Sequence, residues 1–134
     1  MIKLYGDEAK IECEICGKDV IQGSKDKGPG IIVIVENKQG TITDVIPCCK
    51  GTCDDKVSQS VKGVDGWKDV TEFTNPLLFM QNSMAFINNV QQNKFSEEAF
   101  EAYKKVLLVG YQYVLREPTD NEWEKYQINT MINF

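Results

Sequence analysis

The sequence of 134 residues predicts an α+β fold, in which a small N-terminal module of a β-hairpin plus a helix precedes a C-terminal three-helix unit. In the first half, short β-branched runs alternate with glycine-bearing segments, a pattern typical of strands. In the second half, apolar residues recur every three or four positions, a pattern typical of helices. The periodicity changes near residues 63–66, which divides the chain into residues 1–66 and 67–134.

The N-terminal module begins with three β-branched runs, at residues 19–21, 31–35 and 41–46. The last two runs are joined by the segment 37–40, whose asparagine and glycine favour a tight turn, so we expect a hairpin there. A helix is expected over about residues 52–62, with Thr52 as its N-cap and acidic residues in its first turn.

Three further helices are expected in residues 67–134. Asn75 and Pro76 suit the cap and first turn of a helix over residues 76–92. Ser96 suits the cap of a second helix, which Pro118 ends, and the capping box from Thr119 to Glu122 starts a third. We interpret the apolar stripes of these helices as core, and expect both units to pack together through four apolar residues near their junction: Trp67, Phe73, Leu77 and Leu78.

Composition excludes several functions. Histidine is absent, which rules out Ser-His-Asp triads, Cys-His pairs and mixed histidine metal sites within this chain. The net charge of −5 and the single arginine, Arg116, disfavour sequence-specific reading of nucleic acid. The longest apolar run, residues 31–35, is too short to span a membrane, and we expect a cytoplasmic protein without membrane association.

Five cysteines fall into two groups. Cys13 and Cys16 are separated by two residues, a spacing that lets one tight turn aim both sulfurs at the same ion. The second group contains Cys48, Cys49 and Cys53. An odd number of thiols in a reducing compartment favours metal binding over disulfides. Without histidine, the natural assignment is a closed four-sulfur site that holds one structural Zn²⁺ per chain.

Some alternatives remain open at this point. Cys49 is preferred to Cys48 because the shorter reach to Cys53 suits a turn through Lys50 and Gly51 into the helix. Iron is the main rival to zinc, since four thiolates hold either metal. A redox CxxC pair is a further rival, although no thioredoxin-like pattern surrounds it. Lys18 or Lys50 is expected to offset the negative charge of the site.

A cysteine knuckle, a hairpin and a helix whose first turn carries Cys53 resemble the treble-clef and zinc-ribbon folds. The resemblance covers about residues 10–62 and implies a structural zinc held by Cys13, Cys16, Cys49 and Cys53. The second pair departs from the usual two-residue spacing. The cluster, with its Cys-Lys-Gly-Thr-Cys-Asp run at residues 49–54, is also similar to that of small uncharacterised bacterial zinc-finger proteins, a likeness that implies no activity.

The sequence therefore favours a non-enzymatic zinc-binding protein that acts as a protein-interaction or regulatory module. A second copy of the chain is one partner that three short helices allow. One alternative is a nucleic-acid-associated zinc finger, which the acidic charge disfavours. Another is a thiol- or metal-dependent enzyme, for which Cys48 or Cys49 would be the reactive thiol.

Overall fold

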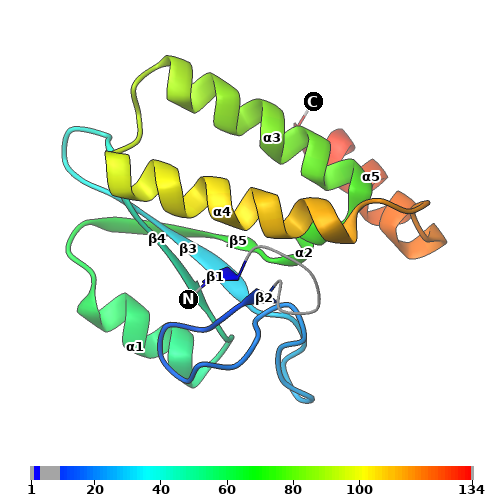
Figure 1. The fold of residues 1–134 in the computed structure, drawn as a ribbon, viewed down its shortest axis with the longest axis horizontal. Helices are drawn as coiled ribbons and strands as arrows, with labels where there is room; N and C mark the ends of the chain where they lie inside the picture. Colours follow the sequence, from blue (N-terminus) through cyan, green and yellow to red (C-terminus); the bar gives the residue numbers. More distant parts are fainter. Residues whose placement is uncertain (1, 4–9, 134) are drawn as a thin grey trace.

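The computed structural model describes residues 2–3 and 10–133, and it confirms a mixed fold of helices and strands. A three-stranded antiparallel sheet forms its centre, with helices on both sides (Figure 1). The elements in chain order are β1 (Ile2–Lys3), β2 (Lys10–Ile11), β3 (Ile31–Glu36), β4 (Ile42–Cys48), α1 (Thr52–Ser60), β5 (Val64–Asp69), α2 (Thr71–Thr74), α3 (Pro76–Gln91), α4 (Glu97–Tyr113) and α5 (Asp120–Asn133).

The predicted hairpin is confirmed as β3 and β4, with Ile34 opposite Val45. Its turn is fixed by Asn37, whose Oδ1 accepts hydrogen bonds from the backbone N–H groups of Gln39 and Thr41, both at 2.9 Å. Gly40 completes the turn with φ of 80°, a conformation that glycine adopts without strain. β3 is the central strand and is covered on both faces, which explains its unbroken β-branched run.

The prediction of a strand at residues 19–21 was wrong. Asp19 forms only an isolated bridge with Glu12, and the next residues lie in a turn. The side chain of Asp19 accepts a hydrogen bond from the N–H of Ile21 at 3.0 Å. Such a local bond offers the backbone an alternative to a strand ladder, which explains the difference.

Strand β5 and the short helix α2 were not predicted. β5 pairs with β3 as an edge strand, and its sequence VDGWKD is too polar to show the alternation of a half-buried strand. The expected boundary after residue 66 falls inside β5, so residues from both expected units contribute to one strand. Trp67 on this strand is 64% exposed, contrary to the expectation that it packs at the junction, whereas Phe73 and Leu78 are buried.

The three predicted C-terminal helices are present as α3, α4 and α5. Asn75 caps α3 by accepting from the N–H of Leu77 at 3.0 Å, and Ser96 caps α4 by accepting from that of Ala99 at 3.2 Å. α4 ends at Tyr113, earlier than the expected limit at Pro118. Among the described residues, no helix is both long enough and apolar enough to cross a bilayer.

The two faces of the sheet are covered differently. α1 and the segment between β2 and β3 lie on one side, and α4 packs against β4 on the other, with α3 beyond it (Figure 1). The prediction that the apolar residues of α3 all belong to the core was wrong in part. Met80, Met84 and Ile87 are 64, 63 and 58% exposed, because α4 and α2 contact other sides of this helix.

Candidate metal centre

The first two cysteines lie in a tight turn that follows β2. The N–H of Cys13 donates to the carbonyl of Lys18 at 2.7 Å, and the N–H of Gly17 donates to the carbonyl of Cys13 at 2.9 Å. Gly17 has φ of 78°, so the turn needs glycine there. A bond of 3.0 Å from the N–H of Glu14 to the carbonyl of Pro47 attaches this turn to β4.

The other two cysteines come from the end of β4 and the start of α1. Cys49 directly follows β4, and Cys53 is the second residue of α1. Gly51, with φ of 91°, is the N-cap of this helix, which corrects the expectation that Thr52 is the cap. Gly51 turns the chain sharply between strand and helix, and this brings Cys53 back toward Cys49.

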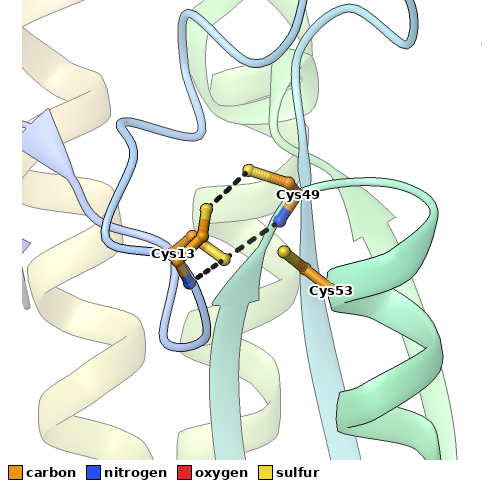
Figure 2. Close-up of side chains that lie close together, drawn as sticks. Cys13, Cys49 and Cys53 are labelled. Carbon is orange, nitrogen blue, oxygen red and sulfur yellow. Dashed lines mark hydrogen bonds between the residues drawn. The ribbon is translucent and has the colours of Figure 1, made fainter.

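The structure brings together Cys13, Cys16, Cys49 and Cys53, all four sulfurs lying within 4.8 Å of one another. Figure 2 shows the sulfurs of Cys13, Cys49 and Cys53 directed toward a common centre. The Sγ atoms of Cys16 and Cys49 are 3.7 Å apart, too far for a disulfide, whose sulfurs lie about 2.05 Å apart. All five cysteines are free thiols, and the four that converge could hold a metal ion.

Cys48 is not a member of this group. It is the last residue of β4 and its side chain is fully buried. Adjacent residues of an extended chain point in opposite directions, so only one of the two neighbouring cysteines can face the turn at Cys13 and Cys16. Burial raises the pKa of Cys48 to about 12, and the nearby carboxylate of Asp54 acts in the same direction. Cys48 is therefore a packed, neutral thiol.

The electrostatic environment of the four sulfurs is uneven. Burial tends to raise the pKa of Cys13, but backbone N–H groups of Cys16, Cys49 and Ile15 donate to its sulfur and lower the pKa to about 7. These N–H to Sγ distances are 3.4 to 3.5 Å. Burial and the neighbouring thiols raise the pKa of Cys49 to about 12 and that of Cys53 to about 11.

This pattern has a chemical meaning. Amide donors around Cys13 favour its thiolate, which is the form that binds metal. Burial is the main cause of the raised pKa values of Cys49 and Cys53, and the nearby Cys13 and Cys16 sulfurs add to it, so a second negative charge in this group is unfavourable without a cation. A divalent cation at the centre would offset that negative charge, because its charge is the largest one nearby.

The lysine expected to compensate the site has another partner. The ammonium of Lys50 lies 3.1 Å from Oδ2 of Asp69, at the end of β5. This ion pair links the loop before α1 to the sheet edge, so Lys50 helps to fix the loop that carries Cys49. Lys18 is exposed, and no contact between it and the sulfurs is seen among the described residues.

Comparison with known proteins returns no relative. No family model matches the sequence, and neither a curated protein nor a solved structure shows significant similarity to it. The interpretation of this centre therefore depends on its own geometry and chemistry.

Proposed function

We propose that Cys13, Cys16, Cys49 and Cys53 bind one zinc ion whose role is structural. The observation that carries this proposal is the convergence of four sulfurs within 4.8 Å. A Zn–S bond of about 2.3 Å in a tetrahedral site corresponds to sulfurs about 3.8 Å apart. The Sγ atoms of Cys16 and Cys49 are 3.7 Å apart, so this pair already has the spacing of one tetrahedron edge.

Zinc fits better than the alternatives. A rubredoxin-like iron site generally uses two cysteine knuckles, whereas here the second pair spans a strand end and a helix start. A redox pair formed by Cys13 and Cys16 alone would leave the convergence of Cys49 and Cys53 unexplained. The order of knuckle, hairpin and helix supports a treble-clef-like module over about residues 10–62.

The chain as a whole acts in this proposal as a non-enzymatic protein-interaction module in the cytoplasm. Four protein ligands fill a tetrahedral ion, which leaves no position for water or substrate. Five free thiols are consistent with a reducing compartment. The exposed apolar side chains of the helical half support a role in protein contact.

Elemental analysis of the purified protein tests the metal assignment. We expect about one zinc per chain in the wild type and in Cys48→Ser, the matched control in which a neighbouring thiol outside the group is changed. Cys49→Ser and Cys16→Ser should each lose most of the zinc, and Cys16 is exposed, so its replacement disturbs little packing. A wild-type protein that folds cooperatively without metal, or that carries iron instead, would contradict the proposal.

A further inference from the structure

The outer side of α3 carries an apolar stripe that no other element of the described residues, 2–3 and 10–133, covers. Met80, Met84 and Ile87 recur at intervals of four and three residues, which places them on one side of the helix. They are 64, 63 and 58% exposed. The opposite side contacts α2, where Asn82 donates to the carbonyl of Glu72 at 3.0 Å. The stripe therefore faces away from the protein.

A second stripe continues this surface onto α4. Leu108 and Tyr111, three residues apart on α4, are 43 and 52% exposed, and Leu115, just after the end of the helix, is 67% exposed. The ring of Tyr111 lies 6.3 Å from that of Phe79, the residue before Met80, so the two stripes adjoin. α3 and α4 run side by side (Figure 1). We call these six side chains the outer helix face.

The size of the outer helix face suits a protein interface. From their exposed fractions, the six side chains present roughly 600 Å², the upper end of the largest apolar patch on a typical monomer. A standard interface buries about 800 Å² on each partner. The exposed amides of Gln81, Asn88 and Gln91 on the same helix would supply the remaining area of the interface as a polar rim.

Charge indicates which partner fits. The protein carries a net charge of −5, yet α3 contains no charged residue, unlike the other four helices of the described chain. In a contact between two identical surfaces, a charge near the two-fold axis meets its own copy and is repelled. The charge-free outer side of α3, on an acidic chain, is therefore suited to a second copy of itself. The α4 part of the outer helix face has charge beside it, at Lys104 four residues before Leu108, so the two-fold axis is expected on α3.

We infer that the outer helix face is the interface of a homodimer. Two copies of α3 pack antiparallel across a two-fold axis near Met84, so that Met80 of each copy contacts Ile87 of the other. Methionine suits the axis because its flexible side chain adapts to its own copy. This inference specifies the partner of the proposed interaction module and is independent of the metal.

Sedimentation velocity on the full-length protein tests the dimer. The wild type should show a concentration-dependent mass of twice the chain. Met84→Glu and Met84→Lys should each weaken association by at least about 100-fold, because like charges then meet at the axis. Mixing the two variants should restore a dimer. Trp67→Glu is the matched control, since Trp67 is equally exposed but lies on β5, and it should dimerise as the wild type does.

The same samples are analysed for zinc and by circular dichroism. A wild type that stays monomeric while it carries zinc would overturn the dimer and leave the metal proposal standing. Dimers that persist in folded Met84→Glu, or a mixture of the two variants that stays monomeric, would also overturn it. A protein that dimerises without zinc would contradict the proposed metal centre and support the dimer.

Discussion

The two sides of the sheet are stabilised in different ways. On the side of α1, residues 12–30 form turns and isolated bridges, and Cys13 and Cys16 of this segment lie beside Cys49 and Cys53, at the end of β4 and the start of α1. On the opposite side, long helices pack through an aromatic cluster around Tyr103. Its ring lies 4.8 Å from that of Phe86, 5.5 Å from that of Phe95 and 5.6 Å from that of Phe73.

The difference follows from how much apolar surface each segment offers. Burial of large aromatic side chains contributes much of the stability of the helical side. The segment 12–30 contributes few large apolar side chains, of which Val20 is fully buried, so it needs another source of stability. The proposed metal ion at the four cysteines would supply it, as metals do in modules whose core is too small.

Removal of the proposed zinc ion should have the largest effect on stability, and the loss should be confined at first to the side of the sheet that carries α1. A strong zinc chelator should abolish hydrogen-exchange protection first in residues 13–54, because the apparent binding energy of structural zinc is on the order of 10 kcal/mol. Amides of α4 should lose protection later. Hydrogen exchange with mass spectrometry measures this order, and simultaneous loss on both sides would show that the metal does not stabilise the α1 side selectively.

Phe73→Ala should destabilise the protein from the helical side by about 3–5 kcal/mol, since it removes a fully buried ring. Urea denaturation measures the change. The zinc content of the folded variant should stay at the wild-type value because Phe73 lies outside the cysteine group. Phe79→Ala is the control, and it should cost less because that ring is only partly buried. Equal costs would show that the aromatic cluster is not the centre of stability.

The smallest effect concerns the link between α4 and α5. Arg116 donates to both carboxylate oxygens of Glu122, at 2.6 and 2.7 Å, and this bond lowers the pKa of Glu122. The pair therefore stabilises the fold above the ordinary pKa of glutamate, about 4.3, and the contribution is lost as the pH falls through the lowered value.

Glu122→Gln should reduce the free energy of unfolding at pH 7 by no more than about 1 kcal/mol, because the partly exposed pair is screened by solvent. The difference between variant and wild type should shrink toward acidic pH. The cysteines also make stability depend on pH, but equally in variant and wild type. Their contribution therefore cancels when the two free energies of unfolding are subtracted. A difference that stays constant with pH would show that the ion pair does not contribute.

Several local features could be predicted from the sequence. The hairpin turn at Asn37 and Gly40 is present. The predicted capping box is also confirmed, since the N–H of Thr119 donates to Glu122 at 2.9 Å and the N–H of Glu122 donates back at 3.2 Å. Such signals act over three or four residues, so neighbouring residues alone determine them. The same holds for the spacing of Cys13 and Cys16.

The tertiary structure decided the rest. The sequence favoured Cys49 over Cys48 through its shorter reach to Cys53 but left Cys48 open, and the direction of the chain at the end of β4 brings Cys49 to the other sulfurs. Strand β5 exists because β3 offers it a partner, although its own sequence is polar. The stripe of α3 has the pattern of a core helix, yet it faces outward. Which surfaces are buried depends on what distant segments bring beside them, and no local pattern contains that information.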